Sequence, residues 1–376
     1  MKRFISLWCA FVIAFSTPVF AENGINVNAK SAVLMEQSTR RILYESNPDE
    51  QLPIASVTKI MTLLLIMEAI DCGKIAMEDM VSVSERAMSM GGSTMFLEAG
   101  EQLSVYEMLK GIAVASANDG CVAMAEFISG SEEAFVEKMN ERAAELGMEN
   151  THFINTNGLD ADGHYSSARD VALMSAELLK HDKIFEFTTI WTDKMHDGKF
   201  DLANTNKMIR FYPGANGLKT GSTSKALCCL SATAVRDDLQ LIAVVLGSPT
   251  SKDRFSSARS LLDYGFANYA VDKPVKQDDC VGTVPVKKGV SDELEICAKE
   301  SFSLLMKKSE KGSCESEIVI PEYVNAPVTK GDIIGKIVFT KDGEQVGETE
   351  VIAANDVAKK RLDDYIAEIF SALFDL

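Results

Sequence analysis

The segment from residue 56 to residue 71 constrains the fold of this chain more than any other stretch. Residues 60–67 read IMTLLLIM, and Gly73 stands where such a helix would end. A helix that is apolar on all sides must be covered on all sides. The sequence therefore predicts a domain built around an interior helix. A hydrophobic content of 46% against 25% charged residues is that of an ordinary globular protein, which can provide this cover.

Strand and helix signals are mixed along the first 272 residues, with strands at both ends and helices in the middle. Strands are expected at 31–37, 41–45, 226–235 and 239–246, and further helices at 104–119, 131–146, 167–180 and 256–269. Residues 236–238 join the last two strands as a hairpin turn. This order predicts an α+β domain.

The composition changes near Val271. From residue 274 to 353 the apolar runs become short and β-branched, and Gly and Pro separate them, at 281–286, 294–297, 318–320, 333–340 and 349–352. This pattern is typical of a small all-β domain, which we expect to be a sandwich.

The last segment, residues 355–376, is predicted to be an amphipathic helix. Its large apolar residues recur at helical spacing, as Leu362, Tyr365, Ile366, Ile369, Phe370, Leu373 and Phe374. One interpretation is a helix docked on the β domain. The other, which we favour, is a helix lying in a membrane interface. The acidic polar face opposes this second interpretation, and the basic run 359–361 partly compensates.

The first 21 residues have the features of a secretory signal peptide. Lys2 and Arg3 precede a short apolar run, and Ala21 ends a possible cleavage site. We therefore expect an exported protein that acts at the outer face of the cytoplasmic membrane. The formal net charge of -17 argues against a nucleic-acid partner, because phosphates require a basic surface.

Three short motifs occur in a fixed order: Ser56-x-x-Lys59, Ser116-x-Asn118, and Lys219-Thr220-Gly221. Ser56 and Lys59 are three residues apart on a predicted helix, so their side chains share a face. A serine hydroxyl needs a base to become a nucleophile, and Lys59 can be that base only when neutral. Burial in the apolar helix and the charge of Lys219 would both lower its pKa.

The other motif residues suit a peptide substrate with an anionic end. Ser116 can relay a proton, and Asn118 can donate a hydrogen bond to a substrate carbonyl. Lys219 and Thr220 can hold an anionic group, and Gly221 lets a substrate backbone lie along the strand. A second Ser-x-x-Lys, at 222–225, lies at a predicted strand start, where serine and lysine would not share a face.

The motif set is that of penicillin-binding proteins and class A β-lactamases. Residues 29–269 resemble a low-molecular-weight penicillin-binding protein, a serine D-alanyl-D-alanine carboxypeptidase of the Firmicute type. The likeness is carried by residues 53–62 (PIASVTKIMT), 157–159 (NGL) and 217–221 (GLKTG). It implies a β-lactamase/transpeptidase-like domain with an antiparallel sheet flanked by helices, then a small β domain and an anchoring helix. The corresponding boundaries are 1–21, 22–272, 273–354 and 355–376.

The resemblance also implies a reaction. Ser56 would attack the penultimate D-Ala of a peptidoglycan stem pentapeptide, with an oxyanion hole from the N–H groups of Ser56 and Ser222. Arg254, placed before the helix expected from Ser256, would help to bind the terminal carboxylate. β-Lactams would acylate Ser56. No cofactor and no metal is implied.

Two alternatives stay open beside this reading: a D,D-endopeptidase on the same fold, and a non-catalytic sensor that binds peptidoglycan or β-lactams. A class A β-lactamase would need a deacylating Glu in a Glu-x-x-Leu-Asn context, and the sequence has none. One departure from the family concerns the residues after Lys-Thr-Gly, where a Gly is frequent. This chain has Leu227, Cys228 and Cys229 there, so the packing of the hairpin beside the site is open.

Overall fold

A sheet of five antiparallel strands forms the centre of the N-terminal part, in the order β2-β1-β9-β8-β7. The computed structural model describes residues 25–195, 198, 200–310 and 314–374, so the predicted signal peptide lies outside them. The strands are β1 (Ser31–Glu36), β2 (Ile42–Ser46), β7 (Ala215–Thr223), β8 (Leu227–Arg236) and β9 (Leu239–Ser248). The expected hairpin turns at Asp237 and Asp238, whose positive φ angles of 46° and 63° suit the right-handed twist of the strands.

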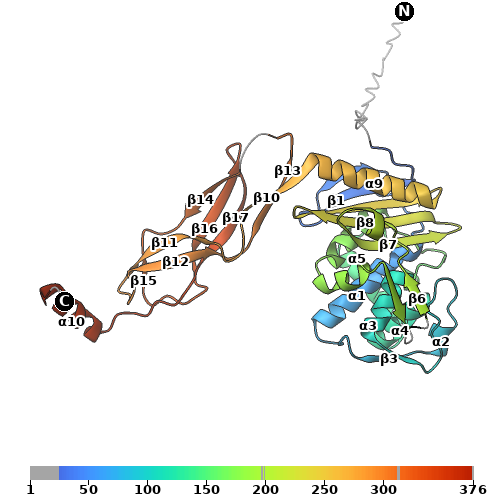
Figure 1. Cartoon of the computed structure of the whole chain (residues 1–376), viewed down its shortest axis with the longest axis horizontal. Helices are drawn as coiled ribbons and strands as arrows, with labels where there is room; N and C mark the ends of the chain where they lie inside the picture. Colours follow the sequence, from blue (N-terminus) through green and yellow to red (C-terminus); the bar gives the residue numbers. More distant parts are fainter. Residues whose placement is uncertain (1–24, 196–197, 199, 311–313, 375–376) are drawn as a thin grey trace, which may run out of the picture.

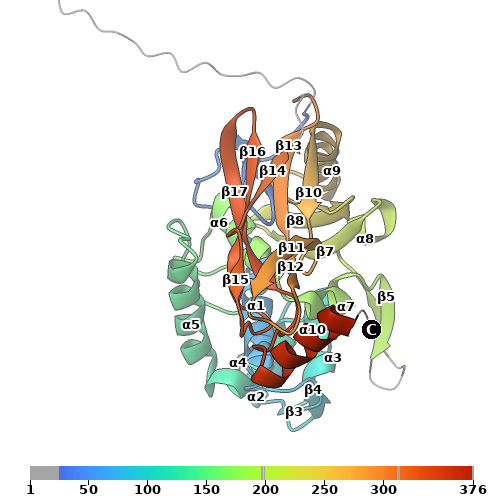
Figure 2. The ribbon, with the colours of Figure 1, turned by 90° about the vertical axis from the view of Figure 1, so that its left-hand side faces the viewer.

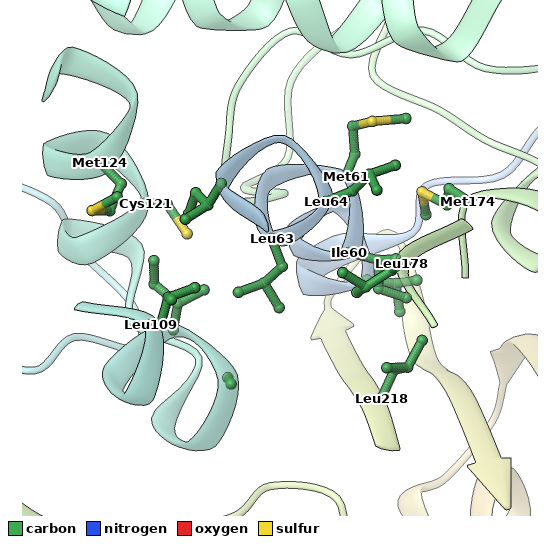
Figure 3. Packing of buried hydrophobic residues seen from close by; sticks show 14 of the residues in the cluster. Ile60, Met61, Leu63, Leu64, Leu109, Cys121, Met124, Met174, Leu178 and Leu218 are labelled. Atoms are coloured by element: carbon green, nitrogen blue, oxygen red, sulfur yellow. The ribbon is translucent and has the colours of Figure 1, made fainter. Parts of the chain in front are cut away.

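Helix α1 (Lys59–Asp71) is the interior helix that the sequence predicts. Its apolar residues are almost all buried. Figure 3 shows side chains surrounding it from several elements, among them Leu109, Cys121, Met174 and Leu218. α4 (Asn118–Ser129), α5 (Glu132–Glu145) and α6 (Ala168–Leu178) complete this layer, while α9 (Ser251–Asn268) covers the other face of the sheet (Figure 1). The sheet therefore separates two layers of helix.

The helix expected over residues 104–119 is interrupted at Ser116, so that prediction is wrong near its C-terminal end. The structure has α3 (Val105–Lys110), a π-helical turn η2 (Gly111–Ala115), and then a break before α4. Ser116 has a left-handed backbone (φ 65°), which cannot continue a right-handed helix. The N–H of Asn118 donates instead to the carbonyl of Ser93. Ser116 and Asn118 therefore lie in a junction, not at the end of one long helix.

Helix α9 begins at Ser251, five residues before the predicted start. The hydroxyl of Thr250 accepts a hydrogen bond from the N–H of Asp253, which is a typical N-cap. Arg254 consequently lies inside the first turn of α9 and not before the helix, which corrects its predicted position. Thr250 could have been recognised in the sequence as a capping residue. The apolar periodicity, on which the predicted start was based, begins only later in the helix.

Smaller elements complete this domain. Two antiparallel strand pairs, β3–β4 and β5–β6, and several short helical turns were not predicted, since each has too few residues for a periodic signal. They are β3 (Met80–Ser82), α2 (Glu85–Met88), β4 (Gln102–Ser104), η3 (Asp182–Ile184), α7 (Phe185–Thr188), β5 (Thr192–Met195), β6 (Phe200–Ala203) and α8 (Met208–Phe211).

The C-terminal part is β-rich, with a core of its own. A six-stranded sheet in the order β14-β16-β17-β12-β11-β15 stands beside the pair β10–β13, and Phe302 stacks on Phe339 at 4.1 Å between ring centroids. The strands are β10 (Tyr269–Val275), β11 (Cys280–Lys287), β12 (Glu293–Ala298), β13 (Phe302–Lys307), β14 (Glu315–Val319), β15 (Val324–Asn325), β16 (Ile333–Lys341) and β17 (Glu344–Ala353). The predicted α+β fold with a C-terminal β domain is confirmed.

The last helix is shorter than expected. α10 spans Leu362–Phe374, whereas the sequence predicted helix from residue 355. Residues 355–361 stay with the β domain, because Val357 bridges to Val328 and Lys359 to Gly289. α10 lies at the end of the molecule opposite the N-terminal domain (Figure 1), and Figure 2 shows it from that end. In the described part of the chain, no helix has the length and apolar character needed to cross a membrane.

Candidate active site

The turn that presents Ser56 is held in an unusual backbone conformation. Residues Ala55–Thr58 form a 3-10 turn, η1, which leads directly into α1, and Ala55 has a positive φ of 48°. Gly158, itself at φ +85°, packs so closely on the carbonyl of Ala55 that a Cβ there would collide with it. Any side chain at residue 158 would push the Ser56 turn out of place.

Ser56 and Lys59 are joined by a hydrogen bond. The Nζ atom of Lys59 lies 2.9 Å from Oγ of Ser56. It also lies 2.6 Å from Oδ1 of Asn118 and 2.7 Å from the carbonyl oxygen of Asn157. A neutral amine has two N–H donors and one lone pair. It can therefore donate to Asn118 and Asn157 while its lone pair accepts the proton of Ser56, which is the geometry of a general base.

Burial makes the neutral form of Lys59 accessible. The side chain is completely buried, and this burial lowers its pKa to about 8, while Cys121 and Asp119 act in the opposite direction. The sequence also predicted that the charge of Lys219 would contribute to the lowered pKa of Lys59. Burial is the largest cause of the lowered pKa of both lysines, and for Lys219 repulsion from Lys59 adds to it.

The junction before α4 orients Asn118. Its side-chain amide donates to the carbonyl of Gly91 at 2.7 Å, while its Oδ1 accepts from Lys59. One amide N–H remains to contact a substrate. Ser116 is nearly buried two residues before it, but among the described residues its hydroxyl makes no hydrogen bond to Ser56 or Lys59. Its role as a proton relay stays a prediction.

Two further residues support this arrangement, and the sequence alone indicated no role for either of them. Asn157 supplies a backbone carbonyl to Lys59, a contact that any residue type could make and that no side-chain pattern reveals. Asp119, buried beside Asn118, accepts hydrogen bonds from the backbone N–H groups of Met95 and Leu97. It thereby fixes the loop that carries Gly91. In the sequence, the acidic residue directly after Ser-x-Asn was the available signal for Asp119, since a carboxylate in a buried motif needs hydrogen-bond donors.

Strand β7 lies against the Ser56 turn. A Cβ at Gly221 would sit 2.7 Å from the carbonyl of Ile54 and 2.9 Å from the nitrogen of Ser56, so only glycine permits this approach. Lys219 is buried on the same strand and donates to the carbonyl of Thr220 at 3.2 Å. Burial is the largest cause of its strongly lowered pKa, followed by repulsion from Lys59 and then Arg254. A bound anion would relieve this repulsion.

Thr220, Ser222 and Arg254 lie together around the end of β7. One guanidinium nitrogen of Arg254 donates to the carbonyl of Gly221 at 2.9 Å, while its Nε is buried without a partner among the described residues. Oγ1 of Thr220 donates to Thr205 at 2.7 Å. Ser222 is exposed, with its Oγ 3.9 Å from the sulfur of Cys228. These are the positions at which an anionic substrate end was expected.

The departure after Lys-Thr-Gly leaves the hairpin intact. Leu227 occupies the left-handed region (φ 57°), where a glycine would be unstrained. Even so, β7 and β8 stay in register, with Thr223 opposite Leu227 and Ser222 opposite Cys228. Among the described residues, no cluster of His, Cys, Asp or Glu could hold a metal ion.

Comparison with known proteins places this geometry in a family. Residues 17–250 match the family described as D-alanyl-D-alanine carboxypeptidase, and residues 269–359 match the C-terminal domain of penicillin-binding protein 5. The chain belongs to the D-alanyl-D-alanine carboxypeptidase family. A likeness to D-alanyl-D-alanine carboxypeptidase DacF of Bacillus subtilis (strain 168) reaches 47% identity over 371 residues, covering 96% of this chain and 95% of DacF.

Solved structures of penicillin-binding proteins agree with the fold. Penicillin-binding protein 5 from Haemophilus influenzae is 32% identical with a TM-score of 0.70, over 89% of this chain and 99% of that one. Penicillin-binding protein D2 from Listeria monocytogenes in its ampicillin-bound form is 29% identical with a TM-score of 0.59, over 65% of this chain and 99% of that one. The predicted family and its serine hydrolase class are confirmed.

Proposed function

We propose that this chain removes the terminal D-Ala from peptidoglycan stem pentapeptides by way of an acyl-enzyme on Ser56. The observation that carries the proposal is the hydrogen bond between Ser56 and a buried Lys59 whose pKa is lowered to about 8. Neutral Lys59 takes the proton of Ser56 as Oγ attacks the carbonyl carbon of the penultimate D-Ala. The C–N bond then breaks, and the leaving amine of the terminal D-Ala receives a proton.

The second half of the reaction regenerates the enzyme. Lys59 activates a water molecule, which hydrolyses the ester on Ser56 and releases the shortened peptide. The backbone N–H groups of Ser56 and Ser222 would stabilise the oxyanion in both halves. Lys219, Thr220 and Arg254 would hold the terminal carboxylate, and the unpartnered Nε of Arg254 supports an anion there. β-Lactams would acylate the same serine, with Ser116 relaying the proton.

Product analysis tests this function against its alternatives. We expect the purified protein to release free D-Ala from a stem peptide ending in D-Ala-D-Ala, which chromatography after derivatisation would quantify. A D,D-endopeptidase would instead convert cross-linked dimers into monomers without free D-Ala. A non-catalytic sensor would be labelled by a fluorescent penicillin but would form neither product. Labelling without D-Ala release would therefore contradict the carboxypeptidase assignment.

Export and attachment to the membrane surface belong to the same proposal. Residues 1–21 would direct export, and α10 would lie in the membrane interface. In support, the described apolar side chains of α10 are exposed: Leu362, Tyr365, Ile366, Ile369 and Phe370. A helix docked on the β domain would cover this face, so the structure favours the membrane interpretation.

Vesicle binding provides the test of α10. We expect the double variant Ile366→Asp/Ile369→Asp to lose at least about 30-fold in partition onto anionic vesicles. Burial of each isoleucine side chain contributes about 1.5–3 kcal/mol to the free energy of binding. Sedimentation with vesicles measures the bound fraction. Asp363→Asn, a change on the helix outside the apolar stripe, removes a negative charge and should bind at least as strongly as the wild type. Equal sedimentation of all three proteins would contradict the anchor.

A further inference from the structure

A groove of about 390 Å³ lies between α8 and the first half of α9. Its apolar lining comes from Met208, Phe211 and Phe255, and its cationic lining from Lys207, Lys252 and Arg259. We call it the α8–α9 groove. Both lysines are exposed, so their ammonium groups can meet a ligand from solvent.

The cations of the α8–α9 groove form no close ion pairs among the described residues. Elsewhere in the domain, Arg86 and Arg169 pair with carboxylates within 4 Å. Lys207, Lys252 and Arg259 form no ion pair with any residue that the structure describes. Two carboxylates lie nearby. That of Asp253 accepts from the hydroxyl of Thr250 at the helix cap and also interacts electrostatically with Lys252. That of Asp263 accepts from the hydroxyl of Tyr212. In a chain with 55 acidic and 38 basic residues, such a cluster indicates an anionic ligand.

Two contacts connect the walls of the α8–α9 groove to the candidate active site. The guanidinium of Arg254 stacks over the ring of Phe255, 4.9 Å from its centroid. On the other wall, Asn206, the neighbour of Lys207, donates to the carbonyl of Gly217 on β7 at 2.9 Å. Because β7 is an edge strand, nothing in the sheet lies beyond it. Both walls of the α8–α9 groove therefore contact residues at or beside the candidate active site.

The architecture restricts where the anion can come from. α10 is at the far end of the molecule from the N-terminal domain (Figure 1), so a membrane held by α10 would not reach the α8–α9 groove. The wall polymer on which the enzyme acts carries many stems, each ending in a carboxylate beside a methyl group. A cationic rim over an apolar floor is complementary to such an end.

We propose that the α8–α9 groove binds the C-terminal carboxylate of a second stem peptide while a first stem occupies the Ser56 site. This inference rests on the proposed function. Binding at two linked positions raises the effective concentration of the substrate. The enzyme therefore prefers polymers with several uncleaved stems over single stem peptides.

Kinetics on two substrates test the inference. We expect Lys207→Gln/Lys252→Gln to lose about tenfold in kcat/KM on a polymer of several pentapeptide stems and to keep wild-type kcat/KM on a single pentapeptide. The control Lys183→Gln/Lys276→Gln removes the same charge from exposed positions outside the α8–α9 groove. It should leave both values unchanged. Equal effects of the two double variants on the polymer would overturn the inference.

A binding measurement keeps the inference testable if the activity itself fails. With Ser56 blocked by penicillin, a single pentapeptide should still bind to the wild type and to the control variant. It should not bind to Lys207→Gln/Lys252→Gln, and the same peptide with an amidated C-terminus should bind to none of them. If penicillin does not react, titration calorimetry of the free protein should show two binding events for the wild type and one for Lys207→Gln/Lys252→Gln. Retained binding of the amidated peptide, or displacement only by a poly(glycerol phosphate), would assign the α8–α9 groove to another ligand and overturn the proposal.

Discussion

Replacing Ser56 with alanine should abolish covalent labelling by a fluorescent penicillin and reduce D-Ala release at least about 10³-fold. The described site offers no second nucleophile in the same place, because Lys59 contacts only the Ser56 hydroxyl, Asn118 and the Asn157 carbonyl. The change removes one small polar atom from a turn, so the fold should be kept. Gel fluorescence after denaturation and a D-Ala assay are the two measurements.

The matched comparison is Ser56→Cys, which keeps a nucleophile at the same position. A thiol near a base can still attack the β-lactam and become acylated, so this variant should retain detectable covalent labelling. Thermal unfolding of both variants should match the wild type, which separates a lost nucleophile from a lost fold. Labelling of Ser56→Ala at the wild-type level would show that another residue forms the acyl-enzyme.

Spacing in the sequence predicted those parts of the site that depend on a regular element. Ser56 and Lys59 are neighbours because three residues along a helical turn bring side chains together. Lys219 and Gly221 face the Ser56 turn because they alternate along one strand. The interior position of α1 followed in the same way from its missing polar face.

The parts that the sequence could not predict depend on backbone geometry or on distant contacts. The interruption at Ser116 lies in a stretch whose apolar residues recur at helical spacing, so the periodic signal does not reveal it. The bond from Lys59 to Asn157 ends on a carbonyl, which every residue type carries. The late start of α10 follows from the bridge between Val357 and Val328, a pairing across the β domain without a local signal.

The rate of acylation by penicillin should rise with pH and level off above about pH 8, the value to which burial lowers the pKa of Lys59. A lowered lysine pKa means that the neutral base is lost as the pH falls below 8, so the rate should fall about tenfold per pH unit there. At pH 7 a pKa of about 8 leaves about a tenth of Lys59 neutral. An ordinary lysine would have only about three parts in ten thousand. Stopped-flow acylation between pH 6 and 9.5 would show the inflection.

Substituting Lys59 itself identifies the group behind this profile. Lys59→Arg should lose at least about 10³-fold in acylation and the inflection near pH 8, because a guanidinium stays protonated throughout. Lys59→Met, which brings no charge into the buried site, should lose as much if the base is what matters. Lys225→Arg is the matched control, because Lys225 ends the second Ser-x-x-Lys but lies on the surface, 3.5 Å from Asp162. A rate independent of pH in the wild type, or an inflection that survives in Lys59→Met, would mean that another group is the base.

A substrate anion beside Lys219 and Arg254 should also favour charge on Lys219, and that charge should in turn oppose a proton on Lys59. Binding of the anionic end would then help to prepare the base that activates Ser56.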